Sequence, residues 1–440
     1  MTLHNKHSIL VIGFYGIVKD HDLEYIFGKD SIRIPFKDRK KFIFKAKWPE
    51  DWNSSGYLEL SEAQLSEIYH LFVKTISRFN VYSGWDLNTI DVHFYEILIH
   101  AYNFLKSNNI RMIIFQDPPH TAWEVIIYIL SKINKLKTII CRQSLLLDGF
   151  FAMHTLGGFN NYIPSDKKYN LPENWFSYNY ENLDLFYMKQ IKPNRNIYQW
   201  FLSDLVSSVY NGWLTRKPKY FKSLMSIVND IKLFFDFRHE NKIKNLSLKE
   251  LPNYFVYVPL HLQPEMTTST LGGKYYNQLF MVYQLRAIVP HNIPIVIKEN
   301  PKQWIHGRGI GFYSKLRKID NVFFAEKQID SLEMIRKSVC TATITGTAGW
   351  ETLKAGKPVI YFGYPWYSHI YGAFAAEKNI FERIQNFIPD ESKYRETLES
   401  LAYKIFKGAV INAHRYRVAD LSYSKNLQLL KSSFNYLINS

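Results

Sequence analysis

The sequence has little of what marks a membrane-spanning or exported protein. Its longest apolar runs, such as residues 9–12 and 125–130, are far shorter than the roughly 20 residues that a membrane helix needs. The N-terminus has no apolar stretch of signal-peptide length. The only two cysteines, Cys141 and Cys340, lie within apolar runs, which predicts buried free thiols instead of disulfides or a metal site. We therefore expect a cytoplasmic protein.

Common motifs of enzyme chemistry are missing as well. The chain has no Walker A segment, no GxGxxG after a strand, no HExxH, no CxxC and no pair of aspartates at a strand end. Its fourteen histidines are scattered. If the chain is an enzyme, we expect a metal-independent reaction with no bound cofactor.

What the chain does have is the composition of a folded protein with a strong positive charge. Apolar residues make up 47% of its 440 residues and charged residues 21%, and the formal net charge is +16. The length predicts two lobes with a cleft between them. The charge favours nucleic acid, anionic lipid or nucleotide phosphates as partners. The 16% of aromatic residues indicates aromatic core packing more than sugar stacking.

Two stretches alternate strand-like and helix-like patterns, which predicts an α/β protein with two Rossmann-like lobes. The first lobe spans residues 1–250, with helices and loops inserted at about 150–250. Its expected strands are residues 8–16, 111–116 and 137–142, and its expected helices are residues 91–106 and 121–135. We expect long loops over residues 150–195.

The second lobe, residues 251–375, has the more regular pattern. Its expected strands are residues 254–260, 294–298, 321–325, 341–344 and 358–362, and its expected helices are residues 275–288, 331–338 and 349–355. Residues 376–440 are expected to add helices at 394–409 and 424–437, with no further strand, and to close the second lobe or cross back over the first.

The clearest local signal is the segment ITGTAGWETLKAGKPVIYFG, residues 344–363. A turn of small residues, containing Thr345, Gly346, Thr347 and Gly349, links a strand to a helix and would present backbone amides to a phosphate. Glu351 could face the ribose of a nucleotide. Alternatively, the threonines cap the helix, and the negative charge of Glu351 interacts favourably with the positive end of the helix dipole.

Two other strand ends in this lobe also carry polar residues. Lys298 and Asn300 follow one strand, and Gln263 and Glu265 follow another. Ligands of open α/β sheets bind outside the carboxyl ends of strands, so the three ends together predict a binding site. A solvent-facing lysine at a strand end is the alternative for Lys298.

Three segments in this order, YVPLHLQPEMTTSTLGG, IVIKENP and TGTAGWETLKAGKPVIYFG, resemble the signatures of bacterial capsule polysaccharide biosynthesis proteins, whose characterised members include β-Kdo transferases. The resemblance covers roughly residues 254–372. It implies a GT-B-like pair of lobes, with a CMP-activated 3-deoxy-2-ulosonic acid (Kdo or a relative) as the donor on the C-terminal lobe. The acceptor, a glycan or glycolipid, would lie on the N-terminal lobe.

Position by position, the resemblance assigns roles to the same strand ends. Lys298 and Pro301 match a Lys-x-His-Pro segment, in which Asn300 replaces the expected histidine and leaves the donor less defined. Gln263 and Glu265 match a Gln-x-acid element, which makes Glu265 the candidate catalytic carboxylate, or a nucleophile if the reaction retains configuration.

The same resemblance places Thr345, Thr347 and Glu351 in the small-residue motif. It therefore implies that these residues help to hold the donor.

An acid or base from the first lobe would complete such a site. Asp148, Asp117 and His120 lie near the ends of first-lobe strands. Because Asp-Gly and Asp-Pro are also ordinary turn sequences, a structural role for each is the alternative.

We therefore expect a glycosyltransferase of capsule or lipopolysaccharide synthesis that uses CMP-Kdo or a related donor. The alternatives are a UDP-sugar transferase or epimerase on the same plan, and a basic nucleic-acid-binding protein, although no nucleic-acid-binding motif is present. Residues 216–249, basic and interleaved with apolar residues, predict contact with the anionic inner membrane, or else a helix that buries its apolar side.

Overall fold

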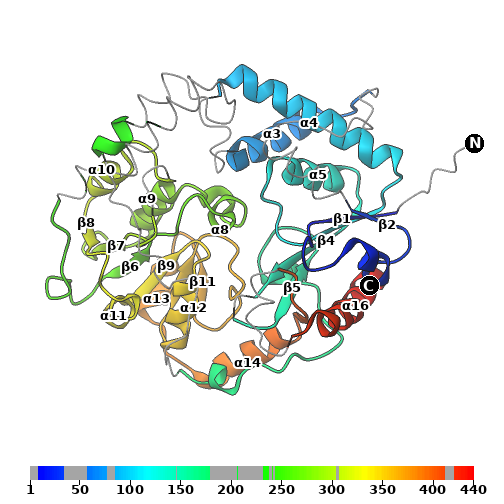
Figure 1. The fold of residues 1–440 in the computed structure, drawn as a ribbon. Coiled ribbons are helices and arrows are strands. Elements are labelled where there is room, and N and C mark those ends of the chain that lie inside the picture. The colour runs from blue at the N-terminus through cyan, green and yellow to red at the C-terminus, as the bar shows by residue number, and fades with distance from the viewer. Residues whose placement is uncertain are drawn as a thin grey trace, which may run out of the picture. The chain divides into compact units, whose positions relative to one another are not determined.

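The computed structural model describes residues 8–33, 57–76, 85–144, 146–178, 206, 231–236, 240, 243–303, 307–411 and 421–440. The chain divides into two compact units (Figure 1). Unit 1 comprises Met1–Ser77, Asp86–Leu171 and Leu398–Ser440, and unit 2 comprises Arg78–Trp85 and Pro172–Thr397. Most of the basic segment predicted to contact membranes lies outside the described residues.

Unit 1 is built on a six-stranded sheet of order β12-β5-β4-β3-β1-β2. Its strands are β1 (Ile9–Ile12), β2 (Ser31–Arg33), β3 (Met112–Phe115), β4 (Lys137–Gln143), β5 (Gly149–Met153) and β12 (Ile405–Lys407). Strands β2, β1, β3 and β4 are parallel, whereas β5 and β12 add an antiparallel edge. The larger helices are α1 (Leu23–Phe27), α3 (Glu62–Ile76), α4 (Leu87–Ser107), α5 (Ala122–Ile133) and α16 (Tyr423–Asn439).

Helices α1 and α16 pack on one face of this sheet, where Phe14, Phe27 and Phe434 meet edge to face. Helix α5 lies against the other face through Tyr128, and α3 and α4 pack on α5. Glu124 defines the start of α5, because its carboxylate accepts hydrogen bonds from the backbone amides of His120 and Thr121.

Unit 2 has a six-stranded, fully parallel sheet of order β11-β10-β9-β6-β7-β8. Its strands are β6 (Val256–Pro259), β7 (Ile295–Lys298), β8 (Val322–Ala325), β9 (Cys340–Thr343), β10 (Val359–Tyr361) and β11 (Ala373–Ala375). The chain winds outward from β6 to β8, then returns to the other side of β6 with β9. This is the doubly wound order, and its topological switch point lies between β6 and β9.

Helices cover both faces of this second sheet. One face packs against α9 (Gln278–Ile288), α10 (Phe312–Arg317) and α13 (Ile380–Gln385), and the other against α11 (Ser331–Lys337), which in turn packs on α12 (Thr347–Lys354). The short helix α8 (Met266–Ser269) follows β6, and α14 (Glu391–Ala402) contains the division between the units.

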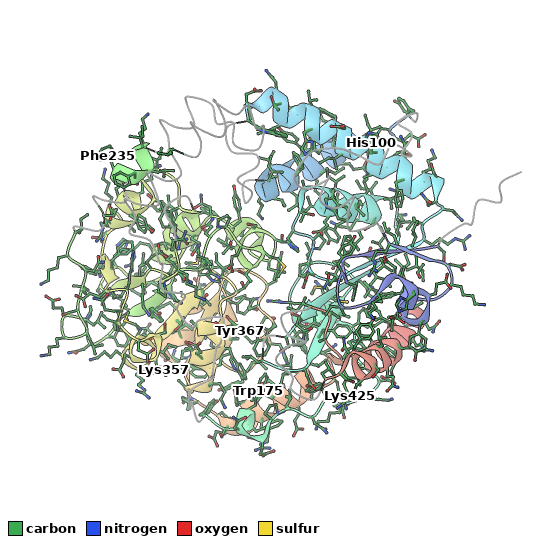
Figure 2. The ribbon with its side chains drawn as sticks, viewed as in Figure 1. His100, Trp175, Phe235, Lys357, Tyr367 and Lys425 are labelled. Carbon is green, nitrogen blue, oxygen red and sulfur yellow. The ribbon has the colours of Figure 1, made fainter. Side chains whose placement is uncertain are left out.

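The first residues of the unit 2 segment Pro172–Thr397 pack against α12 and form hydrogen bonds with it. Trp175, labelled in Figure 2, packs against two other indoles. The ring centroids of Trp350 and Trp366 lie 4.7 Å and 5.9 Å from its own. The buried Lys354 ammonium donates to the carbonyls of Asn174, Trp175 and Ser177. Residues 172–178 therefore belong to unit 2.

The predicted α/β fold with two Rossmann-like sheets is confirmed. Three details differ from the prediction: residues 149–153 form strand β5 where a loop was expected, β11 and β12 follow residue 372 where no strand was expected, and the helix expected over 394–409 ends at Ala402. The division between units falls after Leu171 instead of residue 250. The cleft between the lobes stays a prediction. None of the helices in the described ranges is long and apolar enough to span a bilayer.

Candidate functional site

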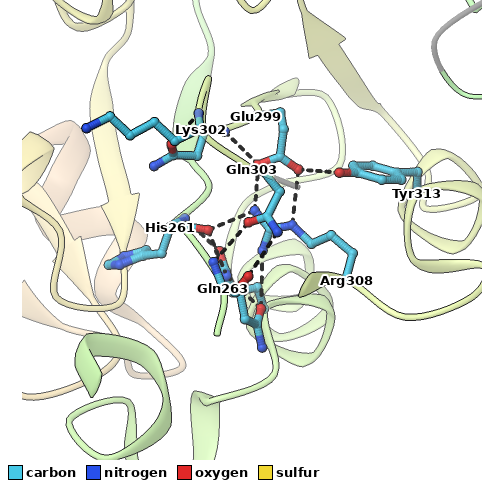
Figure 3. A network of polar contacts seen from close by, with 9 residues as sticks. His261, Gln263, Glu299, Lys302, Gln303, Arg308 and Tyr313 are labelled. Atoms are coloured by element: carbon cyan, nitrogen blue, oxygen red, sulfur yellow. Dashed lines mark hydrogen bonds and ion pairs between the residues drawn. The ribbon is translucent and has the colours of Figure 1, made fainter. Parts of the chain in front are cut away.

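The loop that follows β6 is fixed by a buried ion pair (Figure 3). The Arg308 guanidinium lies 2.5 Å from the Glu299 carboxylate, and both side chains are almost completely buried. Tyr313 donates a hydrogen bond to the same carboxylate at 2.7 Å. The remaining donors of Arg308 reach the His261 carbonyl and the Gln263 side chain. Glu299 is thus fully engaged inside the protein, in a role that sequence reasoning did not assign.

Gln263 is the centre of the second half of this network. Its backbone forms a reciprocal pair of bonds with the Gln303 side chain, both 2.9 Å long. Its side-chain oxygen accepts from Gln278 and Arg308, and its side-chain nitrogen donates to the Tyr276 carbonyl. Because its amide is satisfied within the protein, Gln263 shapes the loop instead of presenting a free group to a ligand.

Asn300, two residues after the end of β7, makes hydrogen bonds to its neighbours in the chain. Its side-chain oxygen accepts from the Lys302 backbone amide at 3.0 Å, and its backbone amide donates to the Glu299 carboxylate. Such an Asx turn stabilises the change of direction before the following residues. The position at which a histidine was expected therefore holds a turn residue.

The ends of β6 and β9 meet at the switch point through His261. Its Nε2 atom lies 2.9 Å from the Thr343 hydroxyl and 3.3 Å from the Ile344 amide nitrogen. Gly346 allows this approach, since a Cβ atom there would come within 3.2 Å of the imidazole and 2.9 Å of Thr343 Oγ1. The imidazole thus links the residues that follow β6 to the end of β9.

Glu265 and Thr345 are brought together by a third residue, Thr267. Thr345 donates its hydroxyl to the Thr267 carbonyl at 2.9 Å, and the Thr267 hydroxyl lies 3.4 Å from the Glu265 carboxylate. Glu265 itself is half-buried and precedes α8. Glu265 and Thr345, two predicted site residues that follow different strands, are therefore linked by hydrogen bonds through Thr267.

The small-residue turn after β9 forms the start of α12, as predicted. Gly346 is the N-cap residue, and Thr347 is the first residue of the helix. Within the described ranges, the backbone N–H groups of Thr347 and Ala348 have no acceptor. Gly349 is required by packing, because a Cβ atom there would lie 2.0 Å from the Tyr367 hydroxyl. That hydroxyl fixes the turn by donating to the Gly346 carbonyl.

Lys298 and Glu351 are both buried and lie close enough for the charge of each to affect the pKa of the other. The buried Lys298 ammonium donates to the Ser331 hydroxyl at 3.1 Å, and the Tyr257 hydroxyl also donates to Ser331. Burial lowers the pKa of Lys298. Burial also raises the pKa of the Glu351 carboxyl to about 7; the charge of Asp330 adds to this shift and Lys298 opposes it. Glu351, 6% exposed, is a buried carboxyl.

The candidates in unit 1 are held by neighbours. Tyr169 donates its hydroxyl to the Asp148 carboxylate. His120 Nδ1 lies 2.8 Å from the Pro118 carbonyl, and Glu124, the capping residue of α5, accepts from the His120 amide. Asp117 follows β3, near enough to Cys141 to help raise the pKa of its thiol, although burial is the larger cause.

Sequence reasoning missed three residues of unit 2 that the structure shows to matter. They are Arg308, which lies 45 positions after the Gln263 side chain that it contacts, Ser331, which begins α11, and His261, which follows β6. Gly307 was the available signal: a Cβ atom there would lie 1.9 Å from the Gln263 carbonyl. No group of three or more His, Cys, Asp or Glu in the described part of the chain could hold a metal ion.

Comparisons with known proteins show several to which the chain is similar. Two solved structures, the β-Kdo 2,7 and 2,4 transferases of Thermosulfurimonas dismutans KpsC, are 10% and 11% identical, and the matches cover 79% and 73% of this chain and 97% and 87% of theirs; both TM-scores are 0.32. The UDP-GlcNAc 2-epimerase of Methanocaldococcus jannaschii is 11% identical, with a TM-score of 0.25 and coverage of 90% and 99%.

At the level of sequence, no curated protein matches the chain. The profile of the capsule polysaccharide biosynthesis proteins, however, matches residues 168–416, which is more than half of the 440 residues. This range includes β6 to β11 and the whole assembly of Glu265, Thr267 and Thr345. The chain belongs to the capsule polysaccharide biosynthesis protein family.

Proposed function

We propose that the chain is a glycosyltransferase of capsule or related surface polysaccharide synthesis. It takes Kdo or a related ulosonic acid from a CMP-activated donor and adds it to a glycan or glycolipid. The observation that carries the proposal is the joining of Glu265 and Thr345 through Thr267 at the switch point of a doubly wound sheet, in a chain of this family. Ligands of such sheets bind at this place.

The residues at the switch point suit the two halves of such a donor. The amides of Thr347 and Ala348 can bind a phosphate at the start of α12, where the helix dipole favours an anion. The buried Lys298 ammonium, at the end of strand β7, would add positive charge to this region. The Glu265 carboxylate can stabilise the oxocarbenium-like positive charge that develops as the glycosidic bond to the phosphate breaks.

Other predicted site residues take supporting parts in this proposal. Gln263 and Asn300 hold the loops on which Glu265 and Lys298 stand. The acid or base comes from unit 1, where Asp148, Asp117 and His120 are the candidates. The reaction needs no metal and no bound cofactor.

Nucleotide release tests the proposal. The purified protein is incubated with CMP-Kdo, CMP-sialic acid, UDP-GlcNAc and UDP-glucose, with and without EDTA, and the free nucleotide and any epimerised sugar are measured. We expect CMP release from CMP-Kdo that EDTA does not reduce. UDP release, or conversion of UDP-GlcNAc to its epimer, would instead support the UDP-dependent alternative and contradict the CMP donor.

We also propose a peripheral association with the anionic inner leaflet, which would bring the enzyme to a lipid-linked acceptor. Within the described part of the basic segment, Ile231 and Phe235 are exposed apolar residues. Basic residues near such a surface contribute about 1 kcal/mol each. Sedimentation with anionic and with neutral vesicles checks this proposal, and equal binding to both would contradict it.

A further inference from the structure

The hydrogen bonds around His261 define which of its ring nitrogens carries a proton. A backbone amide can only donate, so Ile344 N–H, 3.3 Å away, requires Nε2 to be an acceptor. Thr343 agrees with this assignment: its oxygen accepts from the Gly346 amide at 3.2 Å, which leaves the hydroxyl proton to point at Nε2, 2.9 Å away. The proton of the neutral ring is therefore on Nδ1.

His261 stays neutral at physiological pH. Burial lowers its pKa to about 4, and the nearby positive charge of Arg308 contributes to the shift. The residue as a whole is only half-buried, and Nδ1 is not among the buried polar atoms that lack a partner. Within the described ranges no protein group accepts from Nδ1. Nδ1–H is thus a donor with no acceptor in the described part of the chain.

This donor stands beside the start of α12. The close contact between Gly346 and the imidazole puts the ring against the N-cap residue of the helix. The next two amides, of Thr347 and Ala348, also lack acceptors within the described ranges. Three N–H donors from two strand ends are therefore available at the switch point, without any acidic side chain bonded to them.

We propose that His261 is a ligand-binding residue that donates Nδ1–H to the phosphate of the nucleotide, together with the amides of Thr347 and Ala348. This inference rests on the proposed function, because it names the group of that same donor that His261 contacts. A neutral donor suits a group that must also leave, since it binds the phosphate without transferring a proton to it. The same ring also fixes the turn after β9 through Nε2.

Two substitutions separate the two roles of the ring. In His261→Gln, the side-chain oxygen takes the place of Nε2 and can accept from Thr343 and Ile344, but no donor remains at the Nδ1 position. In His261→Asn, the amide NH₂ replaces Nδ1–H and the acceptor at the Nε2 position is lost. The first variant removes the contact to the ligand, and the second removes the contact to the protein.

The test measures the affinities of CMP and of cytidine, which lacks the phosphate, for the wild-type protein and both variants. We expect His261→Gln to keep its melting temperature and its affinity for cytidine, but to bind CMP about tenfold or more weakly, as when a hydrogen bond to a charged group is lost. His261→Asn should melt at a lower temperature and keep more of the preference for CMP over cytidine.

Unchanged CMP affinity in a stable His261→Gln protein would overturn the inference and leave the nucleotide site in place. Equal losses for CMP and cytidine would also overturn it, because the ring would then act only on the shape of the site. If the wild-type protein bound neither CMP nor UDP, the proposed function itself would fail and the inference would fail with it.

Discussion

The carboxyl edges of the two sheets differ in how their switch points are filled. In unit 1, the Gln116 side chain accepts from the Phe14 amide and donates to the Val410 carbonyl. Gln143, on the next strand, accepts from the Val410 amide and donates to the Gly149 carbonyl. Two neutral amide side chains thus join the strand ends of unit 1 to the segment that follows β12. Each of them accepts one backbone hydrogen bond and donates another.

In unit 2 a buried ion pair supports one side of the corresponding edge, and some hydrogen-bond donors remain without an acceptor in the described part of the chain. The Arg308 and Glu299 pair supports the loop after β6, while His261 Nδ1 and the first amides of α12 have no acceptor within the described ranges. The same doubly wound plan therefore supports two outcomes. Where side chains satisfy the edge, it is structural, and where donors remain, it can bind an anion.

The largest expected effect is on the support of the unit 2 edge. Arg308→Ala leaves the Glu299 carboxylate buried without its cation, which should lower the free energy of unfolding by about 3–5 kcal/mol. Urea unfolding followed by circular dichroism measures this. Arg383→Ala, which breaks an exposed ion pair with Glu377, is the matched control and should cost at most about 1 kcal/mol.

Gln116→Ala sharpens the comparison from the other unit. It leaves the Phe14 amide and the Val410 carbonyl without their partner and should cost about 1–3 kcal/mol. A loss in Gln116→Ala as large as that in Arg308→Ala would show that the neutral edge is held as strongly as the charged one.

The next effect concerns the reaction. Glu265→Gln keeps the shape of the side chain and removes its charge, so turnover should fall by a factor of at least about a hundred while nucleotide binding stays nearly intact. Asp148→Asn makes the same change in unit 1. Rates at saturating donor compare the two. Near-normal turnover in a folded Glu265→Gln protein would move the catalytic carboxylate to Asp148 or Asp117.

The smallest effect is a change in pH dependence. A carboxyl whose pKa is raised by folding binds its proton more tightly in the folded state, so stability falls as the pH rises from about 4.5 toward 7. Glu351→Gln removes this penalty and should stabilise the protein by about 2 kcal/mol at pH 6 and almost nothing at pH 4. Unfolding at the two pH values measures the difference.

Lys298→Met tests the same pair from the other side. Without the ammonium, the pKa of Glu351 should rise further, since Lys298 opposes the shift. The loss of stability should then begin at the same pH, because the unfolded pKa of Glu351 sets its onset, but should continue to a higher pH than in the wild-type protein. A pH profile that neither variant changes would show that the pair does not titrate in this range.

The sequence predicts most of unit 2 because apolar runs and small-residue turns alternate there with little interruption. Residues 294–298 and 331–338 were expected as a strand and a helix, and β7 and α11 occupy nearly those bounds. The chain around residues 394–409 was harder, because helix-forming residues continue up to the three residues of β12. That strand is defined by its pairing with β5, a contact between distant parts of the chain.

The site followed the same rule. The small-residue turn after β9 and the polar residues after β6 were predicted because each is a local pattern. The partners that decide their roles were not, since Arg308 reaches Gln263 from 45 positions along the chain. Burial was also not evident from the sequence: Glu351 was predicted either to face a ribose or to interact with the helix dipole, and the structure buries its side chain.

The three tryptophans that pack together at α12, Trp175, Trp350 and Trp366, affect the fluorescence of the protein. Trp350 follows the small-residue turn directly and packs against Trp175 and Trp366, with ring centroids 4.7 Å and 4.9 Å away. Fluorophores this close exchange excitation energy, so their emission depends on their mutual orientation. If this turn binds the donor as proposed, donor binding should alter that orientation, and tryptophan emission should change with it.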